Sequence, residues 1–180
     1  MNIINEKDCL FLIIDIQDKL VKMVNNKLIT DNAIKIAKTT RILNLPTIIT
    51  EQYPKGLGNT IEEIRNEIAD AKYIEKTNFS ALNEFSIKGE IKKTDKKQII
   101  IFGIETHICV LQTAFDLLKE GYEVFVIKDA SASRSDENNN LALQRLMHAG
   151  AQILSTEMVI FELLKSSKHP NFKEVQALIK

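Results

Sequence analysis

The sequence has few cysteines and no net charge, and both shortages exclude classes of protein. Cys9 and Cys109 stand a hundred positions apart, which is unsuited to a disulfide framework or a paired-cysteine metal cluster. The 24 Lys and Arg residues balance 24 Asp and Glu residues, so no excess charge is present to hold a nucleic acid or an anionic membrane. We therefore expect a small-molecule substrate, with no nucleic-acid partner and no membrane partner.

Long apolar runs, repeats and low-complexity tracts are also missing. No stretch approaches the roughly 20 apolar residues that cross a bilayer, and the first ten residues, MNIINEKDCL, do not resemble a cationic secretory leader. A chain of 180 residues with 44% hydrophobic residues is long enough to bury a core. We expect one cytoplasmic domain over residues 1–180.

Short apolar and β-branched runs alternate with segments of helical apolar spacing. The strand-like runs are residues 10–15, 46–50, 72–76, 98–103, 122–127 and 151–154. Helical patterns cover residues 31–44, 60–69, 136–149, the segment from Cys109 to a terminating Gly121, and the C-terminal tail. Thr60 and Glu63 have the spacing of a capping box. This alternation predicts an α/β fold with a mainly parallel sheet and helices on both faces.

Three reactive side chains lie where predicted strands end. Asp15 closes the first strand, Lys76 closes the third, and Cys109 follows the fourth. Singly, each also has a structural explanation: a turn cap, a solvated strand end and a buried helix residue. Because ligands bind beyond the carboxyl ends of parallel strands, we expect the three to meet at one edge of the sheet.

These residue types suit acyl transfer. A helix N-terminus and a lysine ammonium favour a thiolate, and an aspartate can accept the thiol proton and return it to a leaving group. Backbone N–H groups in the turn GIETHIC would then face the oxyanion of a tetrahedral intermediate. The pattern indicates a cysteine nucleophile.

Four ordered motifs carry a family resemblance. They are FLIIDIQDKL with Asp15 and Gln17, TEQYPKGLG at residues 50–58, EKTNFSAL with Lys76 and Phe79, and GIETHICVLQTAFDLL with Cys109; KDASASRS also fits. From about residue 8 to residue 160, the chain resembles the isochorismatase-like cysteine hydrolase superfamily, and within it the isochorismatase-domain subgroup of probable hydrolases whose substrates are poorly defined.

The resemblance implies a three-layer, Rossmann-like fold with about six strands and an Asp15–Lys76–Cys109 catalytic triad. It further implies a cis peptide between Ile104 and Glu105, an oxyanion hole formed by the amides of Glu105 and Cys109, and a homo-oligomer, dimeric or larger. For that subunit interface, the apolar segments at residues 158–164 and 172–179 are candidates, with packing on the sheet as the alternative.

Residues that flank the triad motifs are candidates to line the substrate pocket: Gln17, Glu51, Gln52, Tyr53, Phe79, Thr106 and His107. Tyr53 and Phe79 have the alternative role of core aromatics. For His107 the alternative is a surface helix cap.

Two comparisons narrow the function. By resemblance, nicotinamidases of the superfamily bind a metal through an aspartate and histidines after the second strand, whereas TEQYPKGLGNT has no histidine; a zinc site needs three or four converging ligands. We therefore expect no metal and no cofactor. True isochorismatases cleave a vinyl ether and can do without the cysteine, so Cys109 favours an amidase-type reaction.

The function that follows is a cysteine-dependent hydrolase of a small amide, carbamoyl or related C–N substrate, acting through a thioester. A metal-dependent nicotinamidase and a non-catalytic binding or scaffold protein stay as alternatives, because a fold alone does not fix activity. A redox-sensing thiol at Cys109, resolved by Cys9, is a further alternative.

Overall fold

A computed structural model describes residues 3–24 and 26–180 of the chain. Met1, Asn2 and Asn25, which the expected domain over residues 1–180 includes, lie outside the described residues. The strands are β1 (Cys9–Ile14), β2 (Thr47–Gln52), β3 (Lys72–Lys76), β4 (Gln98–Gly103), β5 (Glu123–Ile127) and β6 (Gln152–Leu154). They form one all-parallel sheet in the order β3-β2-β1-β4-β5-β6.

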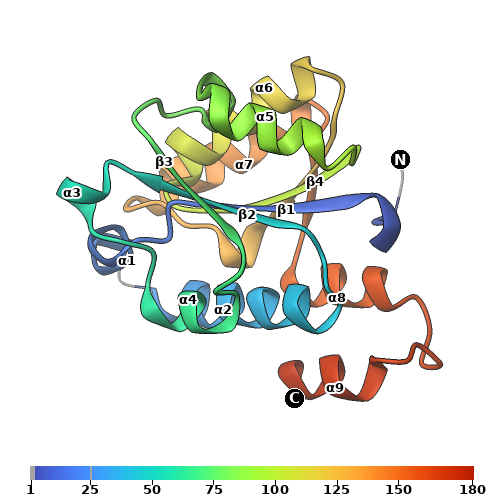
Figure 1. The fold of residues 1–180 in the computed structure, drawn as a ribbon. Helices are drawn as coiled ribbons and strands as arrows, with labels where there is room; N and C mark the ends of the chain where they lie inside the picture. The colour runs from blue at the N-terminus through green and yellow to red at the C-terminus, as the bar shows by residue number, and fades with distance from the viewer. Residues whose placement is uncertain (1–2, 25) are drawn as a thin grey trace.

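Helices cover both faces of the sheet, as Figure 1 shows. One face carries α5 (Phe85–Lys93), α6 (Leu111–Lys119) and α7 (Asp136–His148), and the other carries α2 (Lys27–Ile42), α4 (Glu62–Glu67) and α8 (Thr156–Leu164). The last helix, α9 (Phe172–Gln176), lies outside this second layer and contacts α2. Two short helices, α1 (Asp18–Val24) and α3 (Pro54–Leu57), follow β1 and β2. The predicted three-layer α/β fold with a parallel six-stranded sheet is confirmed.

Strand alternation divides the core between the two faces. In β1, Phe11 and Ile13 pack with α2 and α8, whereas Leu12 and Ile14 pack with α5, α6 and α7. Every residue of β1 and of β4 is buried, because helices cover both sides of these central strands. Successive residues near a strand end therefore point to opposite faces of the sheet, and residues two positions apart share a face.

Several predicted boundaries differ from the structure. The helix predicted for residues 31–44 begins at Lys27 behind an Asn26 cap. The capping box at Thr60 and Glu63 is wrong: α4 is capped at Ile61, and the Thr60 hydroxyl donates to Glu51 Oε1 instead. Gly121 follows the end of α6 with a φ of +85°, which confirms it as the terminator of that helix.

The apolar C-terminal segments pack against the body of the protein. Val159, Ile160, Leu163 and Leu164 of α8, together with Val175 of α9, are buried beneath the sheet. Met158 and Phe161 keep more than a third of their surface exposed. Packing on the sheet therefore accounts for most of the apolar character of these segments. Among the described helices, none combines the length and apolar character needed to cross a membrane.

Candidate active site

The turn after β1 places Asp15 at the carboxyl edge of the sheet. Asp15 adopts a left-handed conformation with φ of +52°, which aspartate tolerates better than most residues. Its backbone N–H still donates to the carbonyl of Thr50 on β2, at 3.2 Å. The chain thus leaves the strand sharply while the carboxylate stays fully buried.

The end of β4 lies unusually close to the end of β1. Gly103 has a φ of +141°, and a Cβ atom built on it would lie 1.9 Å from the carbonyl oxygen of Ile14. That oxygen accepts a hydrogen bond from the N–H of Ile104 at 2.9 Å. Only glycine allows this approach, which brings the turn carrying Cys109 toward Asp15.

Asp15 and Lys76 form an ion pair that is closed off from solvent. Lys76 Nζ lies 2.7 Å from Asp15 Oδ2, and neither side chain has any exposed surface. The Thr50 hydroxyl donates to the other carboxylate oxygen, Oδ1, at 2.6 Å. Both oxygens of Asp15 are therefore held by protein groups.

Lys76 is surrounded by acceptors from three segments. Besides Asp15, its ammonium lies 2.6 Å from Gln52 Oε1 and 3.2 Å from the carbonyl oxygens of both Asn78 and Phe79. An ammonium has three N–H groups, and the hydrogen bonds to Gln52, Asn78 and Phe79 account for all three, so the contact with Asp15 Oδ2 is an ion pair. Lys76 is therefore a fixed positive charge rather than a group free to reach a ligand.

Cys109 lies in a π-helical turn, Thr106–Val110, that precedes α6. The expectation of a thiol at the first turn of an α-helix is thus corrected, because α6 itself begins at Leu111. The thiol is buried and interacts with both Asp15 and Lys76. Burial, and next the negative charge of Asp15, raise the pKa of the Cys109 thiol to about 12, and the Lys76 ammonium only partly opposes them. The Cys109 thiol therefore holds its proton tightly, and the expected route to the thiolate is transfer of that proton to Asp15.

Burial also raises the pKa of Asp15, although the Lys76 ammonium and the hydrogen bonds from Lys76, Thr50 and Cys109 oppose this effect. A raised pKa makes the carboxylate a better proton acceptor. The pair is thus suited to a transfer in which the Cys109 proton moves to Asp15 as the sulfur attacks.

A second polar cluster lies beside the cis peptide. The bond between Ile104 and Glu105 is cis, at the place that the resemblance implied. The buried Glu105 carboxylate lies 3.3 Å from His107 Nδ1 and 3.6 Å from Arg134 Nη1. His107 Nδ1 also lies 2.8 Å from Ser133 Oγ. His107 is therefore held in this cluster, between Glu105 and Ser133.

Two of the pocket candidates, Gln17 and Glu51, have side chains whose polar groups are already hydrogen-bonded within the protein. The Gln17 amide is engaged by backbone: Nε2 donates to the carbonyls of Gln52 and Gly58, and Oε1 accepts from the N–H of Gln52. Glu51 lies on the opposite face of β2 from Thr50 and accepts from the N–H and hydroxyl of Thr60. Both side chains are thus engaged away from the Asp15 carboxylate, although the Gln17 backbone N–H donates to the Asp15 carbonyl at 2.9 Å.

Three other pocket candidates, Thr106, Tyr53 and Phe79, have a polar atom or a ring surface that no other described residue occupies. Thr106 is fully buried, and its hydroxyl has no hydrogen-bond partner among the described residues. Tyr53 and Phe79 are 57% and 54% exposed, so the alternative of core aromatics is excluded for both. Tyr53 also lines a hollow of about 230 Å³ beside Lys76.

Sequence reasoning missed Thr50, and it gave Gln52 only as a pocket candidate rather than as a partner of Lys76. Both stand in the TEQYPKGLG motif, two positions apart on one strand, so they share a face that excludes Glu51. Strand alternation was the signal that could have found them. Ser133, the partner of His107, lies in the KDASASRS segment and had no such signal.

The described residues do not fit a metal site or a cysteine pair. No group of three or more His, Cys, Asp or Glu side chains in them converges in a way that could hold a metal ion. Cys9 packs on the α2 face and Cys109 on the α5 face. Cys9 also lies at the start of β1, roughly 20 Å from Asp15 at about 3.3 Å per residue. Cys9 is therefore not positioned to resolve an oxidised Cys109.

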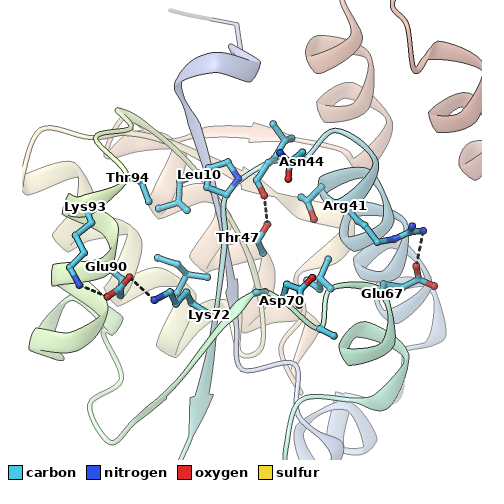
Figure 2. A pocket seen from close by; sticks show the side chains of 17 residues that line it. Leu10, Arg41, Asn44, Thr47, Glu67, Asp70, Lys72, Glu90, Lys93 and Thr94 are labelled. Atoms are coloured by element: carbon cyan, nitrogen blue, oxygen red, sulfur yellow. Dashed lines mark hydrogen bonds and ion pairs between the residues drawn. The ribbon is translucent and has the colours of Figure 1, made fainter.

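A hollow of about 410 Å³ lies at the opposite, amino edge of the sheet. Figure 2 shows Arg41 and Glu67 paired on one side of it, and Glu90 between Lys72 and Lys93 on the other. The charges in these contacts are already matched within the protein. Because ligands of parallel sheets bind beyond the carboxyl ends, the edge with Asp15 is the better candidate.

Comparisons with known proteins show which domain family and which proteins the chain is similar to. The Isochorismatase domain model matches residues 9–158, a range that includes Asp15, Lys76 and Cys109. Isochorismatase domain-containing protein 2 of Danio rerio is 40% identical over 181 residues, covering 98% of this chain and 89% of that protein.

Two solved structures extend the likeness. The structure described as MAR1 ribonuclease from Caenorhabditis elegans superposes with a TM-score of 0.93 at 37% identity, covering 99% of this chain and 92% of that one. The YcaC gene product of Escherichia coli, described as an octameric hydrolase of unknown specificity, superposes with a TM-score of 0.89 at 27% identity, covering 97% and 95%.

Proposed function

Since the chain belongs to the isochorismatase domain family, we propose that it is a cysteine-dependent hydrolase of a small amide, carbamoyl or related C–N substrate. The observation that carries the proposal is the buried Asp15–Lys76 ion pair, whose distance is 2.7 Å, in contact with the Cys109 thiol. A buried carboxylate with a raised pKa beside a thiol is the arrangement that general-base activation of a nucleophile requires.

The first half of the reaction forms a thioester. The Cys109 proton moves to Asp15 while the sulfur attacks the carbonyl carbon, and the amides of Glu105 and Cys109 donate to the resulting oxyanion. The C–N bond then breaks as Asp15 returns the proton to nitrogen, releasing ammonia or an amine. Lys76 stays bound to its four oxygens and supplies the charge that balances Asp15 whenever the carboxylate is ionised.

The second half consumes water. The water oxygen attacks the thioester carbon while Asp15 accepts a proton from that water. The C–S bond then breaks, and Asp15 passes the proton to the Cys109 sulfur. The products are a carboxylic or carbamic acid and the free thiol. Thr106, His107, Tyr53 and Phe79 are the proposed pocket residues, with Gln17 and Glu51 supporting the adjoining loops.

Ammonia release from a panel of small amides, carbamates and nicotinamide tests the proposal, using wild-type and Cys109→Ala protein after chelation. We expect release by the wild type and a loss of at least about 1,000-fold in the variant, because the nucleophile is gone. Thermal unfolding of both proteins controls for folding. An RNA substrate belongs in the panel, because the C. elegans relative is described as a ribonuclease.

Other results would point to the alternatives. Activity that appears only with added zinc or manganese favours a metal-dependent nicotinamidase and argues against the proposal. Equal activity in the wild type and in Cys109→Ala overturns the nucleophile. Silence on every substrate, with Cys109 unreactive toward alkylating agents between pH 7 and 9, favours a non-catalytic binding or scaffold protein.

We further propose a cytoplasmic homo-oligomer. The proposal rests on the related YcaC protein, which is described as octameric. Light scattering on the purified protein gives the mass, which is expected to be a multiple of 20.5 kDa.

A further inference from the structure

Strand β2 lies between the two strands that carry the ion pair. The sheet order places β2 next to β1, which leads into Asp15, and next to β3, which ends at Lys76. In the register, Thr50 stands opposite Ile14 on one side, and Gln52 stands opposite Lys76 on the other. Residues of β2 on the correct face can therefore touch both members of the pair.

We propose that Thr50 and Gln52 are positioning residues: Thr50 holds the Asp15 carboxylate and Gln52 holds the Lys76 ammonium, and together they fix the ion pair beside Cys109. This inference rests on the proposed function. It goes beyond that function by assigning roles to two residues that act through Asp15 and Lys76.

The contacts of Thr50 support the first assignment. Thr50 is fully buried, and its hydroxyl donates to Asp15 Oδ1 at 2.6 Å. The opposite oxygen, Oδ2, faces Lys76. The two contacts hold the carboxylate from both ends, so its plane cannot rotate without breaking one of them. A hydrogen bond to the ionised form also stabilises that form.

The contacts of Gln52 support the second assignment. Its Oε1 lies 2.6 Å from Lys76 Nζ, and its Nε2 donates to the carbonyl of Thr77 at 2.8 Å. The amide thus orients itself on the backbone and presents only its oxygen to the ammonium. As a neutral acceptor, it completes the shell of Lys76 without competing with Asp15 for the positive charge.

Lys76 also fixes the backbone of the segment that follows β3. It donates to the carbonyls of Asn78 and Phe79, so the backbone that carries the exposed Phe79 ring is tied to the same ion pair. Positioning by Thr50 and Gln52 therefore extends from the buried pair to the surface beside it.

The test measures the rate at which iodoacetamide alkylates Cys109, by mass spectrometry of the Cys109 peptide, as a function of pH. This readout needs no substrate, so it stands even if the panel of amides shows no turnover. Thr50→Val removes the hydroxyl, and Thr50→Ser keeps it. Thr47→Val is the matched control, because the Thr47 hydroxyl donates to the Leu45 carbonyl at the far end of β2.

We expect the acidic limb of the profile to move upward by about one pH unit in Thr50→Val, because loss of the hydrogen bond makes ionised Asp15 less stable. On that limb the rate falls about tenfold. Thr50→Ser and Thr47→Val are expected to keep the wild-type profile. An unchanged limb in Thr50→Val overturns the role of Thr50, and an equal shift in Thr50→Ser does so too, since packing alone would then explain it.

Gln52 is tested by Gln52→Met, which keeps the length of the side chain and removes the acceptor. We expect alkylation of Cys109 to slow about tenfold across the profile; with a substrate in hand, kcat falls similarly while KM changes less than twofold. A wild-type alkylation rate overturns the role of Gln52. If Cys109→Ala retains turnover while Thr50→Val shifts the limb, the proposed function fails and the positioning inference stands.

Discussion

At the scale of single residues, the stability of the site depends on a matched pair of charges. Asp15→Asn leaves the Lys76 ammonium buried without a carboxylate, and Lys76→Met leaves Asp15 without a cation. Each change is expected to lower the free energy of unfolding by about 3–5 kcal/mol, because an uncompensated charge stays buried. The double variant is expected to lose much less than the sum.

Urea unfolding of the four proteins at pH 7 measures this coupling. Circular dichroism shows whether each variant is folded at the start. Additive losses would contradict the prediction and would mean that each charge is stabilised by its other contacts, such as Thr50 on Asp15 or Gln52 on Lys76.

Also at this scale, the sequence predicted that Asp15, Lys76 and Cys109 would meet at one edge better than it predicted the residues around them. Each of the three lies at the end of a recognisable strand or follows one. Glu51 was taken for a pocket residue, although its side chain points to the other face of β2 and binds Thr60. This contact joins residues nine positions apart. The local sequence pattern does not show how the chain between them folds back, so it could not predict the contact.

At the scale of elements, the approach of β4 to β1 decides where the π-helical turn lies. Gly103→Ala would place a methyl group 1.9 Å from the Ile14 carbonyl oxygen, in a backbone conformation with φ of +141°. We expect a loss of at least about 3 kcal/mol in the free energy of unfolding, with slower alkylation of Cys109.

The matched control is Gly89→Ala in α5. A Cβ at Gly89 would meet nothing within 4 Å, and alanine is favoured over glycine in a helix by about 0.5–1 kcal/mol. Gly89→Ala is therefore expected to be neutral or stabilising in urea unfolding. A Gly103→Ala variant as stable as the wild type would show that the two strand ends can separate at little cost.

Elements with a strong local pattern were predicted well, and those set by tertiary contacts were not. β3 and β4 have the predicted bounds. β4 is a continuous run of mostly β-branched and apolar residues, whereas β3 has only Tyr73 and Ile74 between charged residues. The helix expected from Cys109 onward is instead preceded by a π-helical turn at residues 106–110, and α6 begins at Leu111. The two kinds of turn have apolar residues at similar spacing. The start of α4 was misplaced because Thr60 is engaged by Glu51 on β2.

At the scale of the whole molecule, the alternation of strands and helices was enough to predict a parallel sheet, but the order of its strands was not predicted. That order matters for the site: Lys76 reaches Asp15 across β2, which lies between β3 and β1. A strand order with β3 elsewhere would separate the pair. The positions of Asp15 and Lys76 at the carboxyl edge of the sheet therefore depend on the strand order as well as on the motifs that contain them.

The two buried thiols are expected to make the free energy of unfolding of the whole protein fall as the pH becomes alkaline. Burial raises the pKa of both Cys9 and Cys109 from 9.0 to about 12. Because the folded thiols hold their protons more tightly than the unfolded ones, their contribution is fully present below pH 9 and is lost as the pH rises from 9 toward 12. At pH 10 the expected loss is about 1.4 kcal/mol for each thiol.

Urea unfolding at pH 7, 8, 9 and 10 tests this in the wild type, Cys9→Ala, Cys109→Ala and the double variant. Each single variant is expected to remove about half of the thiol-dependent decline. The double variant keeps a smaller slope from Tyr73 and Tyr122, whose pKa values burial also raises. A double variant that declines as steeply as the wild type would mean that the thiols ionise as easily in the folded protein as in the unfolded chain. In that case Cys109 would be more accessible to hydroxide than its burial indicates, and the requirement for Asp15 as the proton acceptor would be lost.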